Sequence, residues 1–256
     1  MKRIGLVLAL SLIPGAAGAQ GFWTGQEQRT WGGLEMLVPN SFYGIPAGLP
    51  VGQMTASARY RAPTLLIVGE VPFALTGTGR GGMGNLYIGL ETTPSEAGVF
   101  SEFGLRLPTT EDEQDVYHLV GMAADPDRIE AWAGPFIPVL AAANYRVSNE
   151  WGVGARFRGG CSIWIPTGDR AGGGSLLFGV LMFYEGASFA FQGGFSGRAF
   201  LGDIPLSPEP DVLGQIVFKL DLLSQQARPG MSLRVRTNDR SVVDYVVGAH
   251  LQVGGF

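Results

Sequence analysis

One glycine-rich segment of this sequence has the residue types and spacing of a cofactor site. Gly77-Thr78-Gly79-Arg80-Gly81-Gly82 matches the G-x-G-x-x-G pattern, whose glycines let the backbone approach a dinucleotide. That chemistry requires the turn to open a helix inside a βαβ unit. Here a predicted strand follows from Asn85, so we interpret residues 77–84 as a loop and expect no cofactor.

Residues that could serve catalysis or metal binding are sparse. The sequence holds two histidines, His118 and His250, and one cysteine, Cys161, which excludes an internal disulfide and a cysteine-based metal site. Nucleophilic catalysis usually needs a serine with an adjacent base. No G-x-S-x-G element is present, and no serine stands near either histidine in the sequence. We therefore expect no metal site, no catalytic residue and no enzymatic activity; a lipid-modifying barrel enzyme remains as an alternative.

Charged residues are the polar side chains whose spacing is informative. Arg156 and Arg158 alternate with Ala155 and Phe157, and charged and apolar residues alternate in this way along most of the chain. Side chains of a strand point alternately to its two faces, so each such segment has one polar and one apolar face. The charged residues that the alternation assigns to polar faces are Arg59, Arg61, Glu70, Glu91, Glu102, Arg106, Arg156, Arg158, Arg198, Lys219, Asp221, Arg234, Arg236 and Asp244.

The alternation predicts about twelve strands, with ten as a second possible number. Clear strands are predicted at 54–61, 85–91, 99–107, 151–163, 188–198, 215–221, 231–236 and 243–253, and weaker ones at 32–38, 64–75, 136–146 and 174–184. The segment 174–184 is apolar on both faces, so a buried segment is the alternative there.

Short and long connections between these strands alternate. The short ones are 62–63, 93–98, 145–150, 185–186 and 225–230, and the long ones are 39–53, 76–84, 108–135, 166–173 and 201–211. Only the last connection on the long side, 238–241, is short. Short turns at one end and long loops at the other are typical of outer-membrane barrels, whereas a secreted β-sandwich, the alternative fold, has no reason to sort its loops in this way.

We therefore predict an all-β fold, a closed antiparallel up-and-down transmembrane β-barrel. An arginine facing lipid at the bilayer midplane would cost ~2–4 kcal/mol, so the charged faces belong inside, where they would line a lumen. Opposite charges would pair there, because an unpaired buried charge is costly. Such pairs could line a conducting path or fill a narrow barrel, and the sequence leaves both possibilities open.

One long connection carries a helical pattern. Val116, Leu119, Val120 and Ala123 recur at helical spacing, and Asp125-Pro126 has the form of an N-cap followed by proline at the first helical position. We predict one or two short helices between 111 and 133, in a loop over the barrel mouth. An additional strand at 116–122 is the alternative.

The composition excludes some classes of protein. With 18 Lys and Arg against 22 Asp and Glu, the formal net charge is −4, so a nucleic-acid partner is not expected. Only 16% of residues are charged, against roughly 25% in soluble domains. After the first twenty residues no apolar run reaches the ~18 residues of a membrane-spanning helix, so the apolarity lies in the alternation, as in a membrane barrel.

The first twenty residues have the pattern of a secretory signal. Lys2 and Arg3 precede an apolar run from Ile4 to Ile13, and Ala17-Gly18-Ala19 supplies the small residues of a cleavage site. We expect residues 1–20 to be removed and 21–256 to form one barrel domain in the cell outer membrane. Phe256 resembles the terminal phenylalanine of many such barrels, which implies contact with the barrel-insertion machinery.

Three short motifs resemble a known family. Residues 82–86 (GMGNL), 105–109 (LRLPT) and 165–169 (IPTGD) are similar to motifs of the outer-membrane barrels known as the MetA pathway of phenol degradation family, and 70–73 (EVPF) is similar to their early strand. Asn85 stands in place of the usual acid, and Thr110 where glycine is expected. The resemblance spans roughly residues 30–256 and implies a barrel that passes small, often aromatic or apolar, compounds, in contact with outer-membrane lipid.

The function expected from the sequence is therefore passive passage of small molecules through a charge-lined lumen. A non-conducting structural or surface-binding barrel, filled by internal ion pairs, is the main alternative. A lipid-modifying enzyme and a secreted sandwich are less favoured.

Overall fold

The computed structural model of this chain describes residues 30–40, 51–77, 79–95, 97–110, 116–134, 136–169, 171–202, 212–224, 226–237 and 243–254. The predicted signal at 1–20 and Phe256 lie outside these ranges. The strands are β1 (Trp31–Pro39), β2 (Gly52–Arg61), β3 (Leu65–Leu75), β4 (Gly81–Met83), β5 (Leu86–Thr92), β6 (Val99–Leu107), β7 (Phe136–Ser148), β8 (Val153–Pro166), β9 (Gly173–Glu185), β10 (Phe189–Leu201), β11 (Val212–Leu222), β12 (Ala227–Arg236) and β13 (Tyr245–Gly254).

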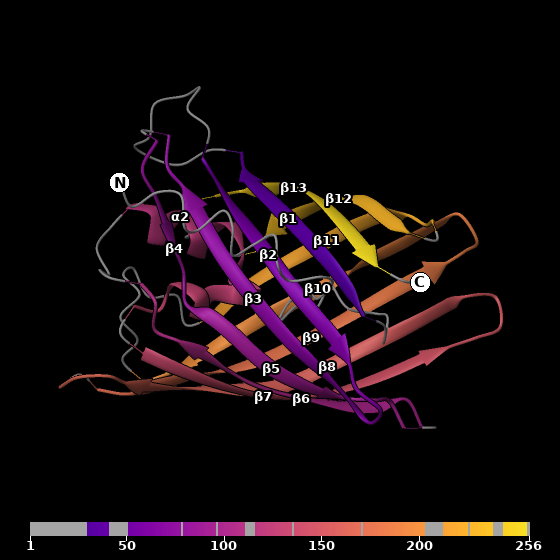
Figure 1. Ribbon diagram of the computed structural model, residues 1–256, viewed down its shortest axis with the longest axis horizontal. Coiled ribbons are helices and arrows are strands. Elements are labelled where there is room, and N and C mark those ends of the chain that lie inside the picture. Colours follow the sequence, from indigo (N-terminus) through magenta and orange to yellow (C-terminus); the bar gives the residue numbers. More distant parts are fainter. Residues whose placement is uncertain are drawn as a thin grey trace.

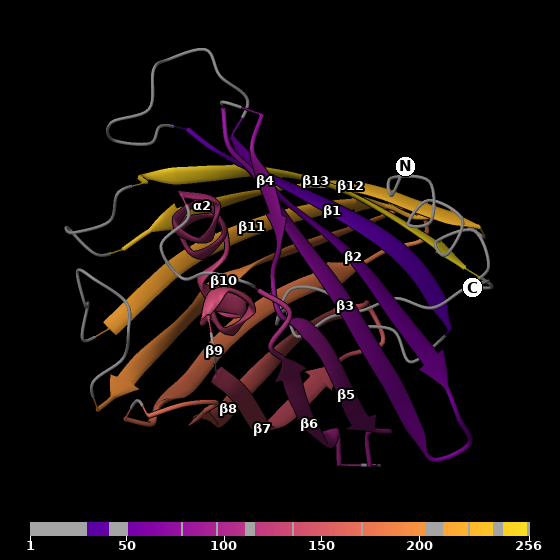
Figure 2. The same cartoon turned by 60° about the vertical axis from the view of Figure 1, so that its left-hand side comes forward.

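The strands form one closed antiparallel barrel. Each strand pairs with its sequence neighbour, β1 pairs with both β2 and β13, and the pairing of β2 with β3 completes the ring. The short β4 and the longer β5 both pair with β3, one after the other, and act as a single interrupted strand. The barrel therefore has the predicted twelve strands (Figures 1 and 2).

The two-residue alternation decides which face of each strand points outward. In β11, Ile216, Phe218 and Leu220 are exposed, while Val217 and Lys219 between them are buried. The same exposure of large apolar side chains continues around the barrel, as on Leu34, Met36, Leu90, Phe103, Ile163, Val180, Phe191, Leu233, Val247 and Leu251. A one-residue shift of register would exchange the two faces, so burial of the charged face fixes the register. An apolar outside and a charged inside make this the architecture of transmembrane β-barrels.

The two ends of the barrel differ as the loop lengths predicted. The short turns lie at the end where Trp31 of β1 pairs with Gly254 of β13. Gly98 and Gly152 lie in two of these turns with φ of +78° and +77°. A Cβ there would meet the carbonyl oxygens of Arg146 and Glu185 at 2.0 and 2.2 Å, so these turns require glycine.

The predicted helical segment forms two short helices. They are α2 (Val116–Ala124) and the 3₁₀ helix η1 (Pro126–Trp132), and Asp125 caps η1 by accepting a hydrogen bond from the backbone N–H of Asp127. The alternative of a strand at 116–122 is wrong. We refer to residues 116–134 as the insertion.

The insertion does not lie over the barrel mouth, as expected from the sequence, but inside the ring of strands (Figures 1 and 2). α2 packs against β1–β4, and η1 packs against β10 and β11 on the opposite wall. Every residue of η1 is buried. The physical reason is its charge: three acidic residues and an arginine at 125–130 find partners on the inner faces of the strands. No helix among the described residues is long and apolar enough to span a membrane.

Candidate functional site

Most of the charged residues assigned to the inner face are buried inside the barrel. These are Arg59, Glu70, Glu91, Glu102, Arg106, Arg156, Arg158, Arg198, Lys219, Asp221 and Arg234. Arg236 is half-buried at the end of β12. Arg61 and Asp244 are exposed, so burial does not place them in the interior. Arg61 is the last residue of β2 and Asp244 precedes β13, so neither is held to one face by pairing on both sides.

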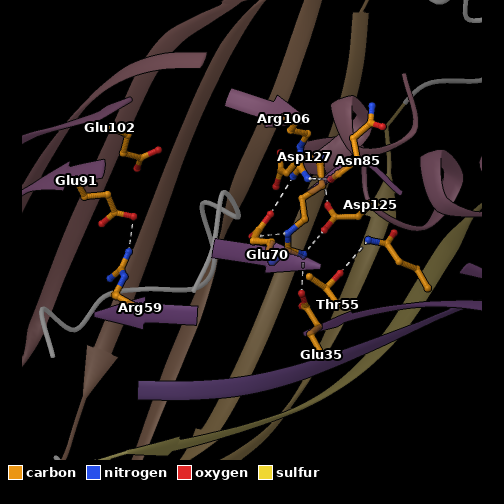
Figure 3. Close-up of polar contacts among 12 residues, drawn as sticks. Glu35, Thr55, Arg59, Glu70, Asn85, Glu91, Glu102, Arg106, Asp125 and Asp127 are labelled. Atoms are coloured by element: carbon orange, nitrogen blue, oxygen red, sulfur yellow. Dashed lines mark hydrogen bonds and ion pairs between the residues drawn. The ribbon is translucent and has the colours of Figure 1, made fainter. Parts of the chain in front are cut away.

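Arg128 of η1 joins the insertion to two strands. Its Nη1 lies 2.7 Å from Glu35 Oε2 on β1, and its Nε lies 3.1 Å from Glu70 Oε1 on β3. The same Nη1 lies 2.5 Å from Asp125 Oδ2, within the insertion. Figure 3 shows these three carboxylates converging on one point inside the barrel. The guanidinium is therefore held by strands on one wall and by its own segment.

Two further arginines complete a balanced cluster around Arg128. Arg234 of β12 lies 2.7 Å from both Glu35 Oε1 and Asp125 Oδ1, and Arg106 of β6 lies 2.8 Å from Glu70 Oε2. We call this the Arg128 cluster: Glu35, Glu70, Arg106, Asp125, Arg128 and Arg234. It contains three arginines and three carboxylates, all nearly inaccessible to solvent. Such a cluster of buried charges is tolerated only because its charges are paired.

The other side of η1 is attached to β10 and β11. Arg198 forms an ion pair with Glu130 and donates to the backbone oxygen of Asp127 at 2.6 Å. Asp127 Oδ2 accepts hydrogen bonds from Ser196 Oγ at 3.0 Å and from Gln215 Nε2 at 2.9 Å. The insertion is thus held between opposite walls rather than lying on one of them.

Asn85 and Gly84, in the break between β4 and β5, fix the C-terminal end of the insertion. The Asn85 backbone N–H donates to the oxygen of Ala131 at 2.6 Å, and its Nδ2 donates to the oxygen of Gly134 at 3.3 Å. Its Oδ1 accepts from Thr110 Oγ1 at 3.0 Å. A Cβ on Gly84 would lie 2.6 Å from the Ala131 oxygen, so this approach requires glycine. The sequence flagged Asn85 only as a departure from a family motif; its role depends on contacts far along the chain.

A second cluster lies nearer the short turns, on β2 and β5–β8. Glu102 is paired with Arg156 at 2.8 Å and with Arg158 at 2.6 Å. Asn144 donates from Nδ2 to Glu102 at 2.8 Å and accepts from Arg156 Nε at 2.9 Å. Arg59 and Glu91 form a neighbouring pair, which Figure 3 places beside Glu102. Among these described residues, arginines outnumber carboxylates by one.

A third cluster lies on β10, β11 and β13. Asp221 contacts the His250 ring through Nε2, and its other oxygen lies 3.2 Å from Lys219 Nζ. Gln192 Nε2 approaches the same oxygen at 3.5 Å. No local sequence pattern joins His250 to Asp221, because the two residues are 29 positions apart.

Several members of these clusters were not predicted from the sequence. The missed charged residues are Glu35, Asp125, Asp127, Arg128 and Glu130. The alternation of Leu34, Met36 and Val38 around Glu35 contained the signal, but in a strand with a weak pattern. Nothing local marks the insertion residues, because their partners lie on other elements. No group of acidic, histidine or cysteine side chains suited to a metal ion occurs among the described residues.

The architecture is similar to that of known outer-membrane channels, although the sequence is not. No family model matches the sequence, and no curated protein matches it. The NanC porin aligns with a TM-score of 0.57 and 6% identity, over 88% of this chain and 99% of the porin. An outer-membrane channel from Pseudomonas putida F1 aligns with a TM-score of 0.58 and 11% identity, over 94% of this chain and 96% of the channel. At this identity the likeness concerns the fold, and it confirms the resemblance in barrel architecture expected from the sequence motifs.

Proposed function

We propose that this protein is an outer-membrane channel that passes small solutes passively along its charged interior. The observation that carries the proposal is the division of one closed barrel into an apolar exterior and an interior of paired arginines and carboxylates. Charged side chains lining a protein interior suit selective permeation, because they replace part of a solute's hydration shell. The two similar folds, a porin and an outer-membrane channel, support the same function.

The insertion is the constriction in this proposal. It carries Asp125, Asp127, Arg128 and Glu130 into the middle of the barrel, so a solute would pass between these groups and the strand wall. The second cluster, around Glu102, would then set the preference for anions or cations in the part of the barrel nearer the short turns. The wall is rich in hydrogen-bonding groups, which favours polar permeants; an aromatic or apolar permeant, implied by the family resemblance, stays a prediction.

The location and partners follow from the same proposal. The exposed apolar side chains would contact outer-membrane lipid. Export would depend on residues 1–20, and the cell's barrel-assembly machinery would then place the barrel in the membrane. Extraction of the protein by detergent, but not by carbonate or urea, is the expected result. Release by urea would instead favour a secreted sandwich.

Conductance tests the proposal directly. Purified full-length protein in planar bilayers with symmetric KCl should give discrete conductance steps. Silence at every salt concentration and voltage, for protein whose folding is verified by heat-modifiable migration in gels, would contradict it. Phospholipase activity of the same preparation should stay at background.

A closed, structural barrel is the second candidate, and the attachment of the insertion favours it. Ion pairs and hydrogen bonds hold η1 and its N-cap Asp125 to β1, β3, β10, β11 and β12, which is the arrangement expected of a permanent plug. Variants that release the insertion separate the candidates. If the wild type is silent and a variant with a released insertion conducts, the insertion is a plug.

A further inference from the structure

Among the buried polar atoms of the described residues that have no hydrogen-bond partner, three lie close together on one part of the inner wall. They are Gln192 Oε1 on β10, Ser232 Oγ on β12 and His250 Nδ1 on β13. The residues are only 3%, 7% and 8% exposed. Buried polar groups in native proteins are nearly always paired, and an unpaired one costs about 1–3 kcal/mol. Three such atoms within four consecutive strands of the barrel, β10 to β13, therefore point to a ligand that supplies the missing partners.

The strand register brings these atoms to one area. Gln192 pairs with Lys219 across β10 and β11, and Lys219 pairs with Ser232 across β11 and β12. His250 is paired with Gly230, two residues before Ser232 on the same face of β12. The four polar side chains are thus direct or diagonal neighbours, within reach of one solute.

Two glycines form the floor of this area. A Cβ on Gly230 would lie 2.3 Å from His250 Nε2 and 2.5 Å from Asp221 Oδ1, so the His250–Asp221 contact passes directly over bare backbone. A Cβ on Gly248 would lie 2.3 Å from Ser232 Oγ. The polar groups are therefore held close to the wall, where larger residues on β12 and β13 would displace them.

The unpaired atoms specify the chemistry of the ligand. When His250 Nε2–H donates to Asp221, the remaining Nδ1 is an acceptor, and Gln192 Oε1 is also an acceptor. The Ser232 hydroxyl can donate or accept. Lys219 adds a cationic donor beside them, balanced by Asp221. Acceptors disfavour an anion and the ammonium disfavours a cation, so the set matches a neutral molecule with several hydroxyl groups.

We propose that Gln192, Lys219, Ser232 and His250 form a binding site for a neutral hydroxyl-rich solute, a sugar or polyol. The inference rests on the proposed channel function, because the solute reaches the site through the barrel interior. It gives the channel a substrate class that neither the charge clusters nor the comparisons specify.

The probes that test this site are myo-inositol and cyclohexanol, which share a six-membered ring but differ in hydroxyl number. Saturation-transfer NMR on the detergent-solubilised full chain should show saturable binding of myo-inositol and none of cyclohexanol. The double variant Ser232→Ala, Gln192→Leu removes two unpaired atoms and should weaken myo-inositol binding about tenfold, the effect of losing one or two hydrogen bonds. Ser162→Ala, at a buried inward serine on β8 whose hydroxyl accepts from Trp164 Nε1, is the matched control and should bind as the wild type does.

The outcomes separate the site from the channel. Equal binding of both probes, no binding of myo-inositol, or wild-type binding by the double variant would overturn the site; absence of binding would mean that water alone satisfies these atoms. Heat-modifiable migration checks that each variant is folded. Myo-inositol binding to protein that shows no conductance would contradict the channel and leave the binding site standing.

Discussion

Arg128 and Glu35 meet at 2.7 Å inside the barrel although 93 residues separate them in the sequence. Arg128 belongs to the insertion and Glu35 to the strand that closes the barrel with β13. The contact therefore links the position of the insertion to the closure of the ring, and both should respond to the same substitution.

Neutralising Glu35 should destabilise the barrel and loosen the insertion. Glu35→Gln leaves three arginines of the Arg128 cluster facing two carboxylates. Breaking a buried pair costs about 3–5 kcal/mol, and we expect a loss near the lower end because Arg128 keeps Glu70 and Asp125. Urea unfolding in lipid vesicles measures the stability, and single-channel recordings should show larger or noisier conductance.

The control for this variant is Glu185→Gln. Glu185 pairs with Arg146 at 2.8 Å, but the two side chains are 32% and 24% exposed, so its loss should cost about 0–1 kcal/mol. Equal stability of the two variants would mean that the Arg128 cluster does not hold the barrel together.

A methyl group at Gly84 should push the insertion away from the wall. In Gly84→Ala the new Cβ would stand 2.6 Å from the Ala131 oxygen, and overpacking of this kind costs about 1–3 kcal/mol. Limited trypsin treatment should then cleave after Arg128, which is buried in the wild type. Gly159→Ala, where no atom lies within 4 Å of the new Cβ, should leave Arg128 protected. Protection of Arg128 in both variants would contradict the role assigned to Gly84.

Removing one arginine beside Glu102 should shift ion preference toward cations. Arg156→Leu and Arg158→Leu each delete a positive charge from the second cluster while leaving Glu102 one arginine partner. Reversal potentials in a KCl gradient should move in the cation-selective direction for both variants. Arg61→Leu, at an exposed strand end, should move them less. Unchanged reversal potentials in all three would mean that Arg156 and Arg158 do not face the permeating ions.

An arginine on the outer face should destabilise the barrel in a depth-dependent way. Ile216 lies near the middle of β11 and Leu222 is its last residue, and both are exposed. Ile216→Arg should cost ~2–4 kcal/mol in lipid vesicles and Leu222→Arg about 0–1 kcal/mol, because the cost falls toward the interface. A similar small cost at both positions would place this face outside the bilayer.

Much of the fold could be read from the sequence because strand periodicity is local. The alternation around Phe157 and Phe218 depends only on the geometry of an extended backbone, so it identified the outer face without knowledge of neighbours. The N-cap at Asp125 was equally local, and it correctly predicted a helix start at Pro126. At Arg61 and Asp244, which are exposed, the alternation alone does not fix the face, because strand pairing ends there.

By itself, the sequence determined a barrel of about twelve strands, its apolar outside, its charged inside and the helical nature of the segment between 111 and 133. Only the tertiary structure decided that this segment lies inside the barrel, that Arg128 meets Glu35 and Glu70, and that three unpaired polar atoms share one wall. The physical reason is that backbone period and capping act between residues a few positions apart. Ion pairs form wherever ring closure and strand register bring charges together, and no local pattern records those distances.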